Sequence, residues 1–508
     1  MTDVWLCQQC NIFFARYSVI TTIFVPDNHH NMKIYLCLLF FFSGLVRSNT
    51  QTVIVSDEMN VNNDRAYFLI GKYDNKMLLL RDKSDAFSLT AFDENMRTSW
   101  NKDLELDKKT AAILEALGNK SIFNVIYKYR SKNHTIVKQH QYNPNGDLID
   151  SITIKDYGSR FSIPEPELLV SEDKKKILLY HYEKPNILEV MSFDTEQMRV
   201  LWQKNIVLSS NYYFDSNELM DMLLDNSGAL YIILSKNNDW DRRDQHFFEI
   251  YRHSDSTEVE PAIVPMQDYL THDVHFDFDN TRQQLVAGGF YAEKNRARAI
   301  GYYRLSVPAS NLLQFQLHFE PFEPEFIARI TGKPNSDQKG IPDALAQQIV
   351  FRKDGGMIII GEQVKRQERE VTYYSRNYYV DRNGSHSIVD YNHDNLFLLS
   401  LNPDGSSHWK TVLFKKQYSQ DQDVYYASYF LIKTATSLRL LFNDDVKSNT
   451  TVFEYIISPD GHNERHSLFS TDNLDLHLRI ADALQVAANE VIIPSEYRAR
   501  VKLVKVVY

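Results

Sequence analysis

Short runs of alternating or continuous apolar residues, separated by polar turns, recur along the chain. Each run is seven or eight residues long and rich in Ile, Leu, Val and aromatic residues, and several follow a turn that contains Gly, Asp or Asn. This period-two pattern between turn residues predicts β-strands and not amphipathic helices. The runs are KMLLLRD (76–82), KILLYHY (176–182), ALYIILS (229–235), QLVAGGFY (284–291), GMIIIGEQ (356–363), LRLLFND (438–444) and EVIIPSEY (490–497).

A hairpin pattern follows most of these runs. LNPDGSSHWKTVL (401–413) aligns with FDENMRTSWNKDL (92–104) and, with one extra residue, with FDTEQMRVLWQKNI (193–206). Copies without tryptophan lie at 142–154, 251–264 and 457–469, and each has a Pro/Asp/Asn/Gly turn between two short runs, which is typical of a β-hairpin. The tryptophan of the three strong copies is Trp100, Trp202 and Trp409, and we interpret it as a structural residue that covers the space between neighbouring sheets.

These patterns combine into a four-stranded unit. Strands A and B, a loop, and the hairpin of strands C and D repeat roughly every 50–60 residues, apart from one longer interval. Such a repeat predicts an all-β fold, an eight-bladed β-propeller, with seven blades as the alternative. The second unit fits least well, because residues 108–118 (KKTAAILEALG) have a helical composition.

The two ends of the repeat array predict how the ring closes. Residues 478–508 contain patterns for strands A, B and C, whereas residues 52–56 form a lone strand ahead of the first unit. We expect this N-terminal strand to complete the last blade, with Val53 and Val55 on one face beside residues 501–508. Closure of this kind removes exposed sheet edges, which invite aggregation.

The N-terminal segment reads as a targeting signal. From Met32, MKIYLCLLFFFSGLVRS has a basic residue, an apolar run and small or apolar residues before a cleavage point after Ser48. The run is shorter than the ~20 residues that a membrane span needs. We therefore expect Met32 as the true start, residues 1–48 as extension and signal peptide, and 49–508 as a single exported propeller domain. The alternative is a genuine N-terminal region with a short anchor.

Composition excludes several classes of function. The 508 residues carry a net charge of −10 without a Lys/Arg block, which argues against nucleic-acid or anionic-membrane partners. Cys7, Cys10 and Cys37 are the only cysteines, so residues 49–508 hold no disulfide, thiolate zinc site or cysteine nucleophile. No Gly-rich phosphate loop, GxSxG or HExxH motif occurs. No catalytic residue is therefore predicted.

Residues 343 onward resemble a known group of proteins. IVFRKDGGMIIIGEQ (349–363) and NLFLLSLNPDGSSHWKTVLFKKQ (395–417) resemble uncharacterised secreted β-propeller proteins of Bacteroidota. The tryptophan hairpin is similar, more loosely, to the repeats of quinoprotein-like (PQQ-type) propellers. The first resemblance implies an exported propeller of no known activity. The second does not imply the quinone cofactor, because the vicinal cysteine pair of those dehydrogenases is absent.

Four long insertions point to one face of the propeller. Residues 237–245, 319–342, 366–394 and 416–424 all fall in B–C or D–A connections, which share a face, and long loops on a rigid scaffold usually carry function. Residues 319–334 predict a short helix near 322–331, docked through Phe322, Phe326 and Ile330.

The 366–394 insertion carries the candidate binding residues. Tyr373, Tyr374, Tyr378 and Tyr379 surround Arg376, and such residues suit a protein interface or sugar stacking. The alternative is a hairpin extension whose tyrosines pack on neighbouring loops. Glu362, directly before this insertion, is the candidate binding carboxylate.

Carboxylates offer weaker candidates. Asp273, His275, Asp277 and Asp279 alternate along one strand, and DWDRRD (239–244) is acidic, so calcium is the one cofactor left open; a strand entering a turn and a solvated loop are the favoured readings. A glycosidase needs two carboxylates across the bond, and Asp221 or Asp273 could partner Glu362. No metal site is predicted.

The sequence thus predicts a secreted or periplasmic, monomeric propeller that binds a protein or glycan through its long-loop face without catalysis. The alternative is a glycoside hydrolase or lyase with carboxylates in the central channel. A structural envelope component is a third reading.

Overall fold

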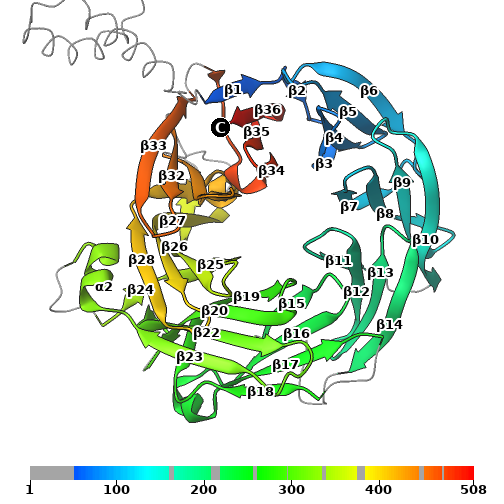
Figure 1. Ribbon diagram of the computed structural model, residues 1–508. Coiled ribbons are helices and arrows are strands. Elements are labelled where there is room, and N and C mark those ends of the chain that lie inside the picture. The colour runs from blue at the N-terminus through cyan, green and yellow to red at the C-terminus, as the bar shows by residue number, and fades with distance from the viewer. Residues whose placement is uncertain are drawn as a thin grey trace, which may run out of the picture. The chain divides into compact units, whose positions relative to one another are not determined.

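The computed structural model describes residues 51–508 apart from 160–164, 208–217, 256–259, 294–295, 334–338, 374–383, 445–450 and 472–473. Within this part of the chain, eight antiparallel sheets of four or more strands follow one another around a ring (Figure 1). The expected all-β, eight-bladed propeller is confirmed. Seven of these sheets are meanders whose first strand lies nearest the ring axis, because consecutive short strands pair through local hairpins, and the last sheet takes its outer strand from the N-terminus.

Blades 1 to 4 follow this order without interruption. From the inner to the outer strand they consist of β3 (Asp64–Tyr73), β4 (Lys76–Lys83), β5 (Phe87–Phe92) and β6 (Thr98–Leu104); β7 (Ala112–Gly118), β8 (Phe123–Ser131), β9 (His134–Tyr142) and β10 (Leu148–Ser159); β11 (Glu167–Val170), β12 (Lys176–Lys184), β13 (Ile187–Asp194) and β14 (Arg199–Val207); and β15 (Leu219–Leu224), β16 (Leu230–Lys236), β17 (Phe247–His253) and β18 (Ala262–Pro265).

Blades 5 to 8 carry the additional elements. Their strands are β19 (Leu270–Asp279), β20 (Gln284–Ala292), β22 (Gly301–Pro308) and β23 (Gln316–Pro321); β25 (Ala344–Phe351), β26 (Met357–Tyr373), β27 (Gly384–Leu401) and β28 (Ser407–Leu413), with β29 (Gln417–Gln420) paired to β27; β30 (Phe430–Lys433), β31 (Leu438–Asn443), β32 (Thr451–Ile457) and β33 (Asn463–Ser470); and β34 (Leu484–Ala487), β35 (Glu490–Tyr497) and β36 (Arg500–Val507). Strands β21 (Arg298–Ala299) and β24 (Ile341–Pro342) form a small separate sheet.

The N-terminal strand closes the ring as the sequence predicts. β1 (Thr52–Val55) pairs antiparallel with β36, placing Val53 opposite Val506 and Val55 opposite Val504, and β2 (Met59–Asn60) continues along the same strand (Figure 1). Val53 and Val55 both pack into the apolar cluster between blades 7 and 8. The chain therefore completes its last blade with its first strand, and no blade is left with three strands.

The hydrophobic core lies between neighbouring sheets. Leu78 and Leu80 of blade 1, for example, pack against Phe123 and Val125 of blade 2, and all four side chains are buried. Because strand side chains alternate between the two faces of a sheet, each blade contributes one apolar row to each of its two neighbours. Every blade is thus stabilised mainly by the blades beside it.

Residues 112–118 are the clearest departure from local composition. They form the inner strand β7, paired with β8 from Ala112 opposite Lys128 to Gly118 opposite Phe123. Pairing and burial between two sheets outweigh the helix propensity of this segment, which is a weak preference. The inner strand of blade 8, β34, is shorter than the pattern at 478–486 suggests, because Ile480–Asp482 form a 3-10 turn, η5.

The single described α-helix lies in the connection between blades 5 and 6. Helix α2 (Pro324–Thr331) begins with proline in its first turn and ends at Gly332, whose φ of 67° suits glycine. Phe322, Phe326 and Ile330 lie in the core cluster of blades 5 and 6, so the helix docks on the propeller. Among the described residues, no helix has the length and apolar character to cross a membrane.

Candidate functional site on the long-loop face

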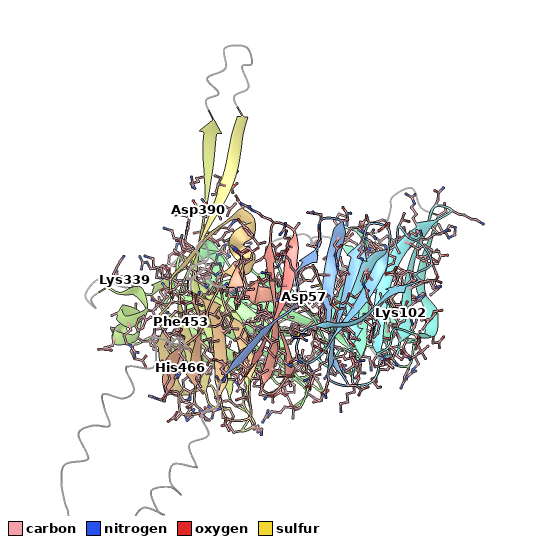
Figure 2. The ribbon with its side chains drawn as sticks, turned by 90° about the horizontal axis from the view of Figure 1, so that it is seen from above. Asp57, Lys102, Lys339, Asp390, Phe453 and His466 are labelled. Atoms are coloured by element: carbon pink, nitrogen blue, oxygen red, sulfur yellow. The ribbon has the colours of Figure 1, made fainter. Side chains whose placement is uncertain are left out.

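The two ends of the ring differ in their connections. The A–B and C–D turns gather on what we call the tight-turn face, and the B–C and D–A connections gather on the long-loop face. All four insertions lie on the long-loop face. Three lie between β16 and β17, β23 and β25, and β28 and β30, whereas residues 366–394 mostly extend β26 and β27 themselves into a longer hairpin. Figure 2 shows the β26–β27 hairpin standing out from this face, with Asp390 near its base.

Exposed aromatic rings mark the long-loop face. Among the described residues, all aromatic side chains that are more than 40% exposed lie at the ends of B strands, in B–C loops or in D–A loops. The C–D turns of the tight-turn face expose aliphatic side chains such as Leu313, but no aromatic ring to this extent. The five exposed aromatic residues are Tyr182, Trp240, Phe414, Tyr425 and Tyr497.

Three of these five aromatic rings form a cation–π contact with an arginine. The guanidinium of Arg243 lies 4.4 Å from the ring centroid of Trp240, that of Arg479 lies 4.6 Å from Tyr425, and that of Arg498 lies 4.9 Å from Tyr497. Such cation–π contacts hold the arginine and the ring in place together. Trp, Tyr and Arg are also the residues most enriched in binding hot spots.

A pocket of about 630 Å³ opens between the loops of blades 5, 6 and 7 on the same face. We call it the basic pocket, because its walls include Arg298, Lys333, Lys416 and the exposed ring of Phe414. Its lining comes from the β21 segment, the end of α2, the base of the β26–β27 hairpin and residues 414–416. A second pocket, of about 590 Å³, lies at the same end of the channel beside β3, β34 and η5.

Residues 414–428, which we call the strap, link the hairpin to blades 7 and 8. The strap contains β29 and a 3-10 segment, η3 (Asp421–Tyr426). Asp390 of the hairpin accepts hydrogen bonds from Tyr418 (2.5 Å) and Gln420 (2.9 Å) of the strap, and pairs with Arg369. The hydrogen bonds from Arg369 and Tyr418 hold the pKa of Asp390 well below its usual range.

Glu362 lies beneath the strap and not at the surface. Its side chain is fully buried, and its carboxylate oxygen Oε1 lies 2.5 Å from Nζ of Lys415, which is also buried. Gln347 and Ser428 donate hydrogen bonds to Oε2 at 3.0 and 2.8 Å. Burial would raise the pKa of Glu362, but Lys415 and His393 outweigh burial and lower it. Glu362 therefore holds the strap in place and is not available to a ligand in this structure.

The tyrosines of the hairpin tip lie mostly outside the described residues. The residues outside the described part are Tyr374, Arg376, Tyr378 and Tyr379, whereas Tyr373 is the last residue of β26. The structure places the base of their hairpin on the long-loop face. Their proposed role in binding stays a prediction.

The repeated tryptophans lie between blades. The indole Nε1 of Trp202 donates to the carbonyl oxygen of Gly228 in blade 4 (2.8 Å), and that of Trp409 donates to Pro459 in blade 7 (2.9 Å). Trp100 packs at the edge of the cluster between blades 1 and 2. Each ring thus contacts the blade that follows its own.

The acidic residues of 272–280 line up along β19, the inner strand of blade 5. Asp273 accepts a hydrogen bond from the backbone of Ala346 in blade 6 (2.6 Å), and Asp279 binds Arg282 (3.0 Å). In DWDRRD (239–244), Asp239 likewise pairs with Arg242. Among the described residues, no three His, Cys, Asp or Glu side chains lie close enough to hold a metal ion.

The channel wall does bring carboxylates near one another. Asp221 on β15 and Asp277 on the adjacent inner strand β19 interact electrostatically. Burial, together with Asp277, raises the pKa of Asp221 to about 6, and burial raises the pKa of Asp273 to about 6. Each carboxylate also accepts a backbone hydrogen bond, Asp221 from Met222 at 2.8 Å. The pairing of Asp221 or Asp273 with Glu362 is not seen, because Glu362 is enclosed in its ion pair.

Sequence reasoning missed the basic pocket and the exposed rings. Arg298 and Lys416 are about 120 positions apart, so their proximity has no local signal. Trp240, flanked by Asp239 and Asp241, did carry a signal, because a ring between charged residues in a loop is usually exposed.

The comparisons with known proteins agree with the fold and go no further. No protein-family model and no curated protein matches the chain. Similar solved structures include a dihydro-heme d1 dehydrogenase, NirN (TM-score 0.36, 10% identity, 86% of this chain and 73% of that one). The β-propeller domain of the Trilobed protease from Pyrococcus furiosus is similar at TM-score 0.33 and 10% identity, over 83% and 99% of the two chains. A polysaccharide lyase of family PL25, an ulvan lyase, is similar at TM-score 0.35 and 10% identity, over 76% and 90%. The chain is a β-propeller protein that distantly resembles these propellers, and no family is assigned.

Proposed function

We propose that this protein is a non-catalytic binding module whose long-loop face takes a glycan or a protein ligand. The observation that carries the proposal is the confinement of the exposed aromatic rings to that face. Exposing an aromatic side chain to water is unfavourable, and exposed aromatic side chains mark interaction sites. Their confinement to one face of the propeller therefore favours that face as a contact surface. The Tyr-rich tip of the β26–β27 hairpin would extend the same surface.

Export supports this role without defining the ligand. The signal-like segment 32–48 and the resemblance of residues 343 onward to secreted propellers of Bacteroidota both favour a secreted or periplasmic protein. Polysaccharides and envelope proteins of those compartments are therefore the ligands to test against a surface that exposes tyrosine and arginine.

The test is a binding screen with matched variants. The full chain would be applied to arrays of polysaccharides and purified envelope proteins, and every hit re-measured with Trp240→Ala and Tyr425→Ala. We expect each substitution to weaken the hits by on the order of tenfold, as hot-spot truncations do. Leu313→Ala and Ile149→Ala, which remove exposed apolar side chains elsewhere, should leave binding unchanged.

Two results would contradict the proposal. One is a set of hits that depends on the tight-turn controls and not on the aromatic rings. The other is the appearance of a cleaved or modified product when the protein is incubated with its hits.

A second candidate, a glycoside hydrolase or lyase working in the channel, is favoured by one observation. Asp221 and Asp277 lie on adjacent inner strands, and the pKa of Asp221 is raised, as in a general acid. Reducing-end or unsaturated-product assays on the same polysaccharides test it. Product formation that is lost in Asp221→Asn, while binding persists, would establish this candidate.

A further inference from the structure

We infer that the basic pocket binds an acidic carbohydrate, with an anionic group held by Arg298, Lys333 and Lys416 and a sugar ring against Phe414. The inference rests on the proposed function and assigns a ligand class to one part of the long-loop face. The pocket volume of about 630 Å³ falls within the range of small-ligand sites.

The cations of the pocket have few partners of their own. Arg465 is paired with Asp444 (2.8 Å) and Lys415 with Glu362 (2.5 Å), so these two are neutralised. Arg298, Lys333 and Lys416 are exposed and form no ion pair with any described carboxylate. Positive charge thus collects at one site of a chain whose net charge is −10, and such a site attracts an anion.

Lys333 has a structural reading beside the functional one. It lies just after the C-terminus of α2, where a cation is stabilised by the helix dipole. That reading does not extend to Arg298 in β21 or to Lys416 in the strap. The experiments below therefore use Arg298 and Lys416.

The same pocket presents hydrogen-bond acceptors that fit sugar hydroxyls. The amide nitrogen of Asn395 donates to Ile330 (2.8 Å) and that of Gln363 donates to Pro342 (3.3 Å). These bonds fix both amides with their carbonyl oxygens unused by any described donor. The Thr331 hydroxyl donates to Ile327 (2.9 Å), which leaves its oxygen as a further acceptor.

Together these features separate an acidic sugar from an acidic peptide. A uronate or sulfated sugar supplies both an anion for the cations and several hydroxyl donors for the acceptors. An Asp or Glu side chain supplies only the anion. Phe414, which is 52% exposed, adds a flat apolar face of the kind that the C–H groups of a sugar ring cover.

The experiment measures binding of the full chain to four probes by calorimetry at low salt. The probes are a hexamer of polygalacturonate, a sulfated dextran oligosaccharide, neutral maltohexaose and poly-L-glutamate. We expect binding of at least one acidic oligosaccharide and weak or absent binding of the other two probes. The first two probes distinguish a carboxylate from a sulfate as the anion.

Variants then locate the site. Arg298→Ala/Lys416→Ala should weaken binding of the acidic oligosaccharide by about tenfold or more, because two charge-assisted contacts are lost. Phe414→Ala should weaken it by on the order of fivefold. Lys353→Ala, which removes an exposed charge in a tight turn, and Leu313→Ala, which removes an exposed apolar side chain, are the matched controls and should have no effect.

Four outcomes overturn the inference. They are equal or tighter binding of poly-L-glutamate through the same residues, equal binding of maltohexaose, acidic-sugar binding unaffected by the double variant, and no binding of either acidic oligosaccharide by the folded protein. The proposed function is judged separately, because ligands lost in Trp240→Ala but not in Arg298→Ala/Lys416→Ala would sustain it while the inference fails.

Discussion

The tight-turn face and the long-loop face of this propeller use similar residue types in different structural roles. On the tight-turn face, carboxylates cap turns: Asp225 accepts hydrogen bonds from the backbone of Ser227 and Ala229, and Asp404 accepts one from Ser406. On the long-loop face, charges and rings face solvent, as Arg243 and Trp240 do. The difference teaches that one face is committed to forming the repeat, which leaves the other free to carry a binding surface.

Two tryptophans show the same contrast between a structural side chain and an exposed one. Trp202 is 7% exposed and donates to Gly228 in the next blade, whereas Trp240 is 47% exposed and has an arginine on its ring. Burial, and not residue type, separates a residue that holds blades together from one that is exposed to solvent and that we propose contacts a ligand.

The largest expected effect concerns the ring on which both faces depend. Deleting residues 49–57 removes β1 and with it Val53, Ile54 and Val55, which pack between blades. Each of these side chains is half-buried, at about half of the roughly 1.5–3 kcal/mol of a fully buried one, and the backbone hydrogen bonds to β36 are lost as well at about 1 kcal/mol each. The free energy of unfolding should therefore fall by about 5 kcal/mol or more. Urea denaturation followed by circular dichroism measures this change. A deletion of residues 1–48 alone is the control, and an equal loss of stability there would contradict the closure argument.

A slightly smaller effect tests whether the long-loop face has its own structural anchor. Lys415→Met should lower the free energy of unfolding by about 3–5 kcal/mol, because it leaves the Glu362 carboxylate buried without its partner. The double variant Glu362→Gln/Lys415→Met should recover most of the loss. Single and double variants of equal stability in urea denaturation would show that the ion pair does not hold the strap.

The third prediction contrasts the two tryptophans directly. Trp202→Ala should cost about 3–5 kcal/mol of unfolding free energy, since it empties a packed site and removes one of the two hydrogen bonds that the Gly228 carbonyl accepts, the other coming from Ser192. Trp240→Ala should change stability by no more than about 0.5 kcal/mol. Thermal and urea denaturation measure both. Comparable losses in the two variants would break the contrast between the faces.

The smallest expected effect lies on the channel wall that joins the faces. The pKa of Asp221 and of Asp273 is about 6 in the folded protein, above the value of 3.8 that an ordinary aspartate has. A raised pKa favours folding at low pH, so this contribution is complete below about pH 4 and is lost as pH rises through 6.

Asp221→Asn and Asp273→Asn should therefore each stabilise the protein at pH 7.5 by about 1–3 kcal/mol relative to wild type, and by much less at pH 4. Asparagine keeps the acceptor oxygen that Asp273 offers to Ala346. Urea denaturation at the two pH values checks the difference. Equal effects at both would show that these carboxylates are not strained by burial.

The sequence by itself determined most of the strands and their hairpins, and it favoured eight blades over seven. These features rest on neighbours within a few positions: alternation places apolar residues on the faces of a strand, and an Asp-Gly turn such as Asp404-Gly405, with φ of 92° at the glycine, reverses the chain locally. The lone strand at 52–56 also had a local signature, and the pattern of only three strands over residues 478–508 gave it a place.

Only the tertiary structure decided which side chains meet. Composition favoured a helix at 108–118, but pairing with β8 imposed a strand. Glu362 looked available beside the insertion, but Lys415, 53 positions away, closes over it. Tyr67 meets Glu496 across 429 positions, and Arg298 shares a pocket with Lys416, because the ring brings distant blades side by side. Contacts of this kind depend on the closed ring and leave no pattern in the order of residues.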